Sequence, residues 1–386
     1  MKKKYDIVKQ EIKSSILDGT FQPLQKISSE SELMKQFGVS RHTVRAAIGE
    51  LVNEGWLYRE QGAGTFCADR KMDHRLTSGG KQKNIAIITT FISDYIFPSI
   101  IRGAESYLSR HGYNVSLFST NNDHENEKRI LERILSEPFD GVIVEPTKSA
   151  TSNPNINYYL NIERQNIPYI MINAYYEELE PLSITMNDEK GGYIQAEHLI
   201  QLGHTNIVGF FKTDDLQGAK RMKGFIKAHR NYGIPINPNG IVTYNTSEKA
   251  TKPLEALAKF LSLDREVRPS AVVCYNDELA ISLLDVLREK NIRVPEDLSL
   301  VGFDNSFMGK LTEVKLSTID HPQSKMGETA AEIIVDLLKE KHGQQKKSAG
   351  KENRQSIIFE PKLIVRNSTK SLIQTKQEPD NPVLST

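Results

Sequence analysis

The sequence of 386 residues predicts an N-terminal winged helix-turn-helix, followed by a larger α/β domain that is two-lobed and built on parallel sheets. Three observations predict this fold class. Residues 28–68 carry, in order, the signals of a helix, a glycine turn, a helix and two short strands. From residue 84 onward, short apolar runs alternate with amphipathic stretches, as parallel strands and their covering helices do. More than ten strands are expected, which exceeds one comfortable sheet and favours two lobes.

Three helices are expected in the first domain. Residues 4–18 carry apolar side chains at helical spacing, and Gly19 ends that helix. Ser29 and Glu32 have the S-x-x-E spacing of a capping box, which marks the start of a second, short helix. Gly38 supplies the left-handed residue that ends this helix.

The third expected helix begins after Ser40, which is a suitable N-cap, and is closed by Gly55. Helical spacing places Arg41, His42 and Arg45 on a face away from the apolar side. Two short strands, WLYRE and TFCA, then flank a glycine-rich tip. A helix, a glycine turn and a helix with scattered arginines also occur in proteins that never contact nucleic acid, so this pattern alone leaves both interpretations open.

The stretch SSESELMKQFGVSRHTVRAAIGELVNEGWLYREQGAGTF resembles the GntR family of bacterial transcription factors along its whole length. The G-V-S-R-x-T-V-R core and the Q-G-x-G-T-F wing carry the resemblance. It implies binding to double-stranded operator DNA, and the charge of residues 1–83, with 15 Lys/Arg against 10 Asp/Glu, is compatible with a phosphate-binding surface. The candidate DNA contacts are Lys4, Ser29, Glu30, Ser40, Arg41, His42, Thr43, Arg45, Gln61 and Gly62.

Residues 84–366 resemble the effector domain of the LacI/GalR repressors, which shares its fold with periplasmic sugar-binding proteins. The residues that carry this resemblance are FDGVIV at 139–144, GGYIQAEHLIQLGH at 191–204, RMKGF at 221–225, NDELA at 276–280, VPEDLSLVGFDN at 294–305 and STIDHP at 317–322. It implies two lobes joined by three crossovers, a ligand in the cleft between them, and a homodimer. We expect the chain to change lobe near Met186–Asn187 and to return near Ser317–His321.

Ligands of open α/β sheets bind beyond the carboxyl ends of the strands, so polar and aromatic residues that follow the apolar runs are candidates. Such groups suit a polyhydroxylated ring, because donors and acceptors pair with its hydroxyls and aromatic rings cover its C–H face. Taken singly, each candidate is also explained as a turn residue, since Asn and Asp form turns and helix caps wherever strands end. The candidates, several of them carried over from the family motifs, are Asp94, Tyr95, Phe97, Glu145, Tyr175, Arg221, Asn276, Asp277, Asp304 and His321.

The combination of a GntR-type head and a LacI-type sensor resembles the arabinose repressors of Gram-positive bacteria. The resemblance implies a repressor that L-arabinose releases from its operator; another sugar or a nucleoside remains an alternative effector. An enzyme is the competing class, since Glu145 and Asp304 imitate a glycosidase pair. The sequence contains no phosphate-binding Gly-rich loop, no G-x-S-x-G and no His/Cys cluster with metal spacing, so neither catalysis nor a metal or other cofactor is expected.

The expected boundaries are 1–70 for the DNA-binding domain, 71–83 for a polar linker, 84–366 for the sensor and 367–386 for a disordered tail. A polar, charged insertion spans 339–355. No apolar run is long enough for a transmembrane helix, and the basic N-terminus lacks the apolar core of a signal peptide, so a cytoplasmic location is expected. Cys67 and Cys274 are too few for a disulfide framework.

Overall fold

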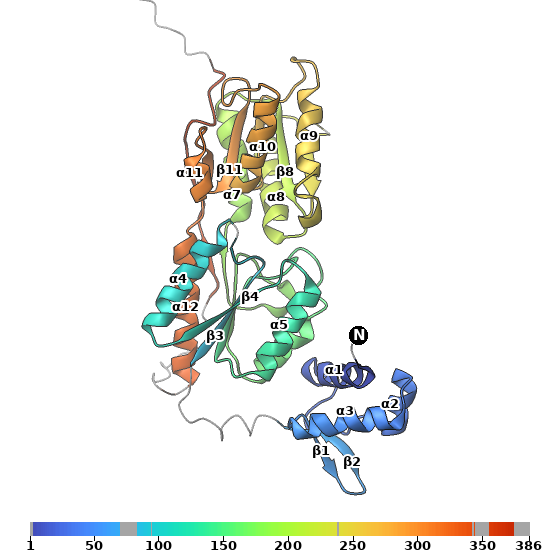
Figure 1. Cartoon of the computed structure of the whole chain (residues 1–386). Coiled ribbons are helices and arrows are strands. Elements are labelled where there is room, and N and C mark those ends of the chain that lie inside the picture. Colours follow the sequence, from blue (N-terminus) through green and yellow to red (C-terminus); the bar gives the residue numbers. More distant parts are fainter. Residues whose placement is uncertain are drawn as a thin grey trace, which may run out of the picture. The chain divides into compact units, whose positions relative to one another are not determined.

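The computed structural model describes residues 3–69, 83–93, 95–237, 239–341, 343 and 355–373 (Figure 1). The chain divides into two compact units. The first comprises Met1–Lys148, Ser152–Ser183 and Ser324–Ser356, and the second comprises Ser149–Thr151, Ile184–Gln323 and Ile357–Thr386. The first long passage to the second unit thus begins three residues before the expected Met186–Asn187, and the return lies just after the expected Ser317–His321. No helix in the described ranges is long and apolar enough to cross a membrane.

The N-terminal part of the first unit forms the expected winged helix-turn-helix. Its elements are α1 (Lys4–Leu17), α2 (Glu30–Phe37), α3 (Arg41–Asn53), β1 (Leu57–Glu60) and β2 (Gly64–Cys67). The capping box is present: the Ser29 hydroxyl accepts from the Glu32 N–H, and the Glu32 carboxylate accepts from the Ser29 N–H. Gly38 ends α2 at φ +59°, where a side chain is strained. These local signals therefore act at the predicted positions.

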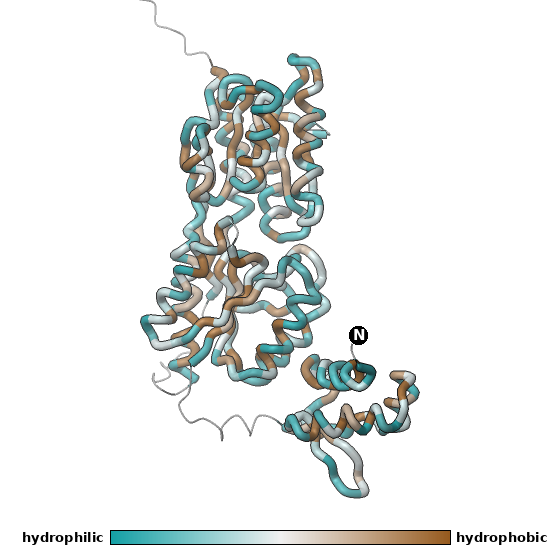
Figure 2. Tube along the Cα trace, viewed as in Figure 1, coloured by the Kyte–Doolittle hydropathy of each residue, from teal (hydrophilic) through white to brown (hydrophobic). Residues whose placement is uncertain are grey.

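Apolar side chains from all three helices meet in the interior of this part of the chain. Leu33 of α2, Val44 and Leu51 of α3 and Val8 of α1 are each at most 1% exposed. The strands β1 and β2 pair antiparallel, from Leu57 opposite Cys67 to Glu60 opposite Gly64. The tip between them is exposed and hydrophilic (Figure 2). The buried stripe thus fixes which face of α3 remains exposed.

The sheet of the first unit has the strand order β13-β7-β6-β5-β3-β4, with every described pairing parallel. Helices α4 and α12 cover one face and α5 the other (Figure 1). Gly103 of α4 and Gly327 of α12 let these two helices touch, because an added Cβ would lie 2.1 and 1.9 Å from a backbone oxygen of the opposite helix. The elements are β3 (Asn84–Thr89), α4 (Phe97–Arg110), β4 (Asn114–Ser119), α5 (His124–Ser136), β5 (Gly141–Val144), α6 (Ile156–Arg164), β6 (Tyr169–Ile172), β7 (Ser183–Met186), α12 (Gln323–Lys341) and β13 (Ile357–Phe359).

The sheet of the second unit has the order β14-β12-β11-β10-β8-β9. Successive strand residues pack on opposite faces: Val208 and Phe210 join the cluster under α9 and α10, whereas Ile207 and Phe211 join the cluster under α7 and α8. At one edge, β14 pairs antiparallel with β12, so this sheet is mixed rather than wholly parallel. The elements are α7 (Asp188–Gln201), β8 (Ile207–Lys212), α8 (Leu216–Asn231), β9 (Ile241–Tyr244), α9 (Lys252–Leu261), β10 (Ala271–Val273), α10 (Asp277–Glu289), β11 (Ser299–Asp304), α11 (Phe307–Leu311), β12 (Ser317–Asp320) and β14 (Lys362–Ile364).

Each of the apolar runs that predicted a strand contains one; these runs are 84–91, 114–120, 139–147, 167–174, 206–211, 270–277 and 298–305. Not every one of these strands is buried. The strand β4 lies at a sheet edge and its residues are half-buried or exposed, because only one neighbour covers it. Most of the expected linker, most of the 339–355 insertion and the end of the tail lie outside the described residues. Part of the tail is placed: Ser368 is fully buried, where its hydroxyl donates to the Leu300 carbonyl, and the Leu372 N–H donates to the Leu202 carbonyl. The expectation of disorder is therefore wrong for residues 368–373.

Candidate nucleic-acid interface and effector site

The outer face of α3 presents the three basic side chains that helical spacing selected. Arg41, His42 and Arg45 are exposed, while Val44 and Leu51 on the opposite side are buried. Arg45 donates from Nε to both carboxylate oxygens of Glu30 on α2, at 3.0 and 2.9 Å. Arg41 approaches the same carboxylate at 3.8 Å. The structure thus brings the predicted arginines together around one acidic side chain.

The other candidate DNA contacts divide between helix ends and the wing. Ser40 caps α3, accepting from the Thr43 N–H at 3.3 Å, and also bonds the Thr43 hydroxyl at 2.9 Å. Ser29 caps α2 in the same way. Lys4 is exposed at the start of α1, and Gln61 and Gly62 are exposed at the tip between β1 and β2. Both serines therefore have a structural task that is independent of nucleic acid.

In the second unit, the helix α8 carries Arg221 into a buried polar cluster. Its guanidinium donates from Nε to Asp188 at 2.8 Å and from Nη1 to the Tyr275 carbonyl at 2.8 Å, and its Nη2 lies 3.6 Å from Asp304. The same group lies 3.5 Å from the centre of the Phe303 ring. Burial alone would lower the pKa of Arg221, but Asp188 and Asp304 outweigh that effect and raise it. Arg221 is thus a permanently charged donor with a fixed orientation.

The Asn276–Asp277 pair is placed at the start of α10. Asn276 is its N-cap and accepts from the Leu279 N–H at 2.9 Å. Asp277 is fully buried and accepts from the Thr318 hydroxyl at 2.7 Å and from the Ser306 N–H at 2.8 Å. Burial raises the pKa of Asp277 to about 7, although these hydrogen bonds oppose the shift. Asp277 therefore connects the start of α10 to the loop after β11 and to strand β12.

His321 follows β12 and is 6% exposed. Burial, aided by the positive charge of Arg221, lowers the pKa of His321 to about 3. Its imidazole is therefore neutral at physiological pH, with one nitrogen that donates and one that accepts. Such a ring suits a hydroxyl-rich ligand better than an anionic one.

Several polar residues of this unit were not among the predicted site residues. Tyr275 donates its hydroxyl to Asp215 at 2.7 Å, and Lys212 pairs with Asp215 at 2.9 Å. The side-chain oxygen of Gln217 is buried and, among the described residues, has no hydrogen-bond partner. Asp188 is the residue that the sequence signalled best, since Asn187–Asp188 follows a strand and opens a helix just as Asn276–Asp277 does.

In the first unit, Glu145 lies just after β5 and is 5% exposed. Its carboxylate accepts from the Thr90 N–H and hydroxyl at 2.9 and 2.7 Å and from the Asn173 amide at 2.9 Å. Three strand ends therefore converge on this carboxylate, as the strand-end argument expects. Tyr95 has φ +57°, Phe97 is buried at the start of α4, Tyr175 is half-buried, and Asp94 lies outside the described residues.

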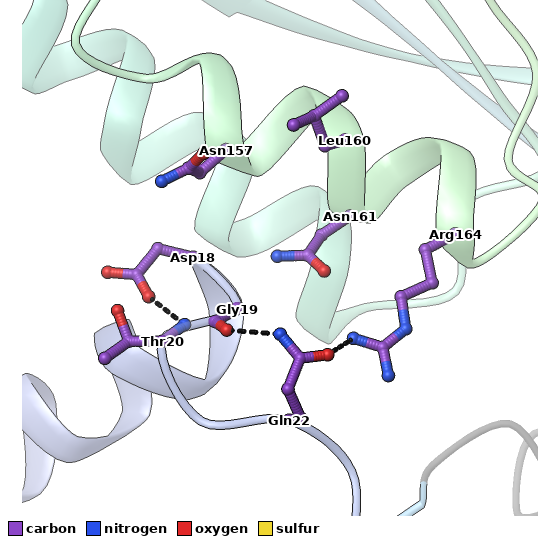
Figure 3. Close-up of a pocket in the computed structure, with 8 residues that line it drawn as sticks. All are labelled: Asp18, Gly19, Thr20, Gln22, Asn157, Leu160, Asn161 and Arg164. Atoms are coloured by element: carbon purple, nitrogen blue, oxygen red, sulfur yellow. Dashed lines mark hydrogen bonds between the residues drawn. The ribbon is translucent and has the colours of Figure 1, made fainter.

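A polar pocket lies where the end of α1 meets α6 (Figure 3). The Thr20 N–H donates to Asp18 at 2.8 Å, the Gln22 amide donates to the Gly19 carbonyl at 2.6 Å, and Arg164 donates to Gln22. Several polar groups of this pocket thus bond to one another, and none of the lining residues belongs to the predicted sites. In the described part of the chain, no group of three or more His, Cys, Asp or Glu side chains is placed to hold a metal ion.

Known proteins resemble this chain both in its DNA-binding part and in its sensor. Residues 4–67 match the gntR family of bacterial regulatory proteins, and residues 196–369 match the periplasmic binding protein-like domain. The chain is 62% identical to the arabinose metabolism transcriptional repressor of Halalkalibacterium halodurans over 369 residues, which cover 96% of this chain and 97% of that protein. The chain belongs to the arabinose metabolism transcriptional repressors.

A second arabinose metabolism transcriptional repressor, from Geobacillus stearothermophilus, is 50% identical over 96% of this chain and 98% of its own length. A solved LacI family transcriptional regulator from Enterococcus faecium with bound ribose is 25% identical, with a TM-score of 0.62 over 75% of this chain and all of that one. These findings confirm the predicted architecture: a GntR-type winged helix-turn-helix joined to two parallel-sheet lobes of LacI type. This arabinose repressor is a DNA-binding transcription regulator and not an enzyme.

Proposed function

We propose that this repressor binds operator DNA through the exposed face of α3 and the wing, and that L-arabinose bound by the sensor releases it. The observation that carries the sugar site is the buried Arg221, held between Asp188 and Asp304 against the Phe303 ring. A charged donor flanked by carboxylate acceptors matches the hydroxyls of a pentose, and the Phe303 ring holds the guanidinium in place. The solved relative with bound ribose shares this fold and holds a pentose.

The sugar hydroxyls have defined partners in the second unit. Arg221 has five N–H donors, of which its hydrogen bonds to Asp188 and to the Tyr275 carbonyl use two. We expect the outer donors of Arg221, the Asp304 carboxylate, the Asn276 amide and the neutral His321 ring to bind hydroxyls. The buried oxygen of Gln217 lies one helical turn before Arg221 on α8 and would accept from another.

Polar groups at the strand ends of the first unit supply further hydroxyl partners under this proposal. Glu145 is the main candidate, because a buried carboxylate with oriented donors around it is already fixed in position. Tyr95, Phe97, Tyr175 and Asp94 remain candidate contacts on the evidence of the sequence. Loss of one buried polar partner costs about 1–3 kcal/mol, so Glu145→Ala should weaken binding ~5–150-fold.

The DNA side of the proposal places two winged helix-turn-helix domains on a pseudo-palindromic operator, which requires a homodimer. The candidate dimer surface is α11, where Phe307, Met308 and Leu311 are 72%, 58% and 65% exposed. Neighbouring large apolar side chains on one short helix form a surface that association would remove from water. The proposal also includes a cytoplasmic location, because a bacterial repressor acts where the chromosomal operator is.

Operator affinity with and without saturating L-arabinose, at one fixed salt concentration, tests the proposed function. Two sites coupled by about 1–3 kcal/mol would give ~5–150-fold weaker operator binding in the sugar's presence, and operator DNA must weaken sugar binding by the same factor. D-Arabinose, which has the same composition and mirror-image stereochemistry, is the control. An operator affinity that L-arabinose leaves unchanged or increases would contradict release by the sugar.

Another pentose, a hexose or a nucleoside is the second candidate effector, since the same donors serve any polyhydroxylated ring. Calorimetric titration of the full chain with L-arabinose, D-ribose, D-xylose, D-galactose and adenosine separates these possibilities. We expect L-arabinose to bind most tightly. Tighter binding of another compound would keep the architecture and replace the effector.

A further inference from the structure

Asp188 stands at the first position of α7, directly after the N-cap Asn187, and is 2% exposed. Its place is set by close packing of α7 on α8. Gly192 lies against the Arg221 backbone, where an added Cβ would come within 2.1 Å of the carbonyl oxygen. Gly224 lies against α7, where an added Cβ would come within 1.9 Å of the Glu189 oxygen. These two glycines let the helix backbones touch and bring the Asp188 carboxylate beside the side chain of Arg221.

The Asp188 carboxylate occupies one edge of the Arg221 guanidinium. It accepts from Nε at 2.8 Å, while the Tyr275 carbonyl accepts from Nη1 and the Phe303 ring lies under the plane at 3.5 Å. A planar guanidinium with Nε anchored, one Nη bonded and one face covered has little rotational freedom. Its remaining donors are therefore aimed in a fixed direction, toward Asp304.

We propose that Asp188 is a positioning residue for sugar binding: its carboxylate orients Arg221 so that the outer guanidinium donors meet the sugar hydroxyls. This inference rests on the proposed function, because it assumes that the Arg221 cluster binds L-arabinose. Asp188 does not itself need to touch the sugar. It acts by removing in advance the rotamer freedom that a long, unanchored arginine would lose on binding.

The charged groups around Asp188 make its hydrogen bond with Arg221 depend on pH. Arg221 and Lys220 face it from α8 and Asp304 faces it from the end of β11; Asp277 acts on Asp304, and the neutral His321 lies near Arg221. Burial raises the pKa of Asp188 to about 6, against the lowering effect of Arg221. Protonation as the pH falls through about 6 therefore replaces a charge-assisted hydrogen bond with a weaker one. Sugar affinity should fall over the same interval.

The test is calorimetric titration of the full chain with L-arabinose at pH 7.5 and 5.5, for the unaltered protein, Asp188→Ala and Asp188→Asn. Asp188→Ala should weaken binding about 10–100-fold at pH 7.5. Asp188→Asn keeps an oxygen that accepts from Nε, so it should lose less than about tenfold. It should also show a smaller loss of affinity between pH 7.5 and 5.5 than the unaltered protein, with Asp277 supplying what pH dependence remains.

Glu189→Ala is the matched control. Glu189 is the next residue on α7 and also links α7 to α8, pairing with Lys223 at 2.6 Å and Lys227 at 3.1 Å, but on the exposed side. It should leave sugar affinity within about twofold, whereas a role of Asp188 in helix packing alone would make the two variants alike. Thermal unfolding reports whether each variant folds, and if Asp188→Ala does not, the pH response of Asp188→Asn decides.

Two failures are distinguishable. Unaltered protein that does not bind L-arabinose would overturn the proposed function, and this inference with it. Unaltered protein that binds, together with a folded Asp188→Ala of equal affinity or an Asp188→Asn with the same pH response as the unaltered protein, would overturn the positioning role alone.

Discussion

The Nε of Arg45 on α3 donates to both carboxylate oxygens of Glu30 on α2, at 3.0 and 2.9 Å. Both side chains are accessible, with 61% and 31% of their surfaces exposed. An ion pair this exposed contributes at most about 1 kcal/mol, so it holds Arg45 without burying it. The acidic side chain at this place gives the basic face of α3 an internal competitor for the DNA phosphates.

We expect Glu30→Gln to increase binding to random duplex DNA about 2–5-fold at low salt, because it removes one negative charge that repels phosphates. The ratio of operator to random-DNA affinity should fall, since Arg45 loses the carboxylate that orients it. Fluorescence anisotropy with both duplexes at two salt concentrations measures this. A higher operator preference in the variant would show that Glu30 opposes recognition rather than orienting Arg45.

Arg45→Ala should weaken binding to the operator by about 1–3 kcal/mol and relax specificity at one base position if Arg45 reads a base edge. The operator for this test is selected from random duplexes with the unaltered protein. Arg59 on β1, a basic residue beside the wing tip, provides the comparison Arg59→Ala. Equal losses on operator and random DNA for Arg45→Ala would make Arg45 a phosphate contact only.

Gly192→Ala should destabilise the sensor by about 1–3 kcal/mol or more, because the new methyl group would overlap the Arg221 carbonyl oxygen. Separation of α7 from α8 should also weaken sugar binding. Gly49→Ala in α3 is the matched control, since nothing lies within 4 Å of its added Cβ. That change should raise stability by about 0.5–1 kcal/mol through helix propensity. Calorimetric unfolding compares both; an unchanged melting temperature in Gly192→Ala would contradict the close helix contact.

Asp277 should make stability fall as the pH rises from about 4 to about 7. Its folded-state pKa, about 7, is above the value near 3.9 of an unfolded chain, so the folded state holds the proton more tightly. The contribution is complete below about pH 4 and lost by about pH 7. In Asp277→Asn, the free energy of unfolding measured with urea should change less over this pH interval. Part of the change should remain, because the pKa of Asp188 is raised as well. The same dependence of unfolding free energy on pH in the variant would show that a group other than Asp277 is responsible for it.

Phe307→Glu combined with Leu311→Glu should convert a dimer to a monomer, because two charges would have to lose water in an apolar contact. Sedimentation equilibrium measures the mass, and operator binding should weaken in parallel. Val267→Glu is the control, since Val267 is 56% exposed but does not belong to α11. A double variant that remains dimeric would exclude α11 as the dimer surface.

Sequence reasoning recovered the elements whose signals are local. The capping box of Ser29 and Glu32, the left-handed Gly38 and the N-cap Ser40 each act within three or four residues, so neighbouring residues suffice to identify them. The short strands β9 and β14, of four and three residues, were missed, because a run this short shows no clear periodicity and its pairing with a neighbouring strand decides its structure. The order of residues 368–373 likewise depends on distant partners such as Leu300.

The sequence by itself determined the family, the helix-turn-helix with its exposed basic face, and the candidates Arg221 and Asp304, because these reside in short motifs and periodic patterns. Only the tertiary structure decided what those candidates touch. Asp188 and Arg221 are 33 residues apart, and they meet because Gly192 and Gly224 let two helices approach at backbone contact. Periodicity ranks side chains by the face they occupy, whereas a hydrogen bond between two helices depends on how closely their backbones pack.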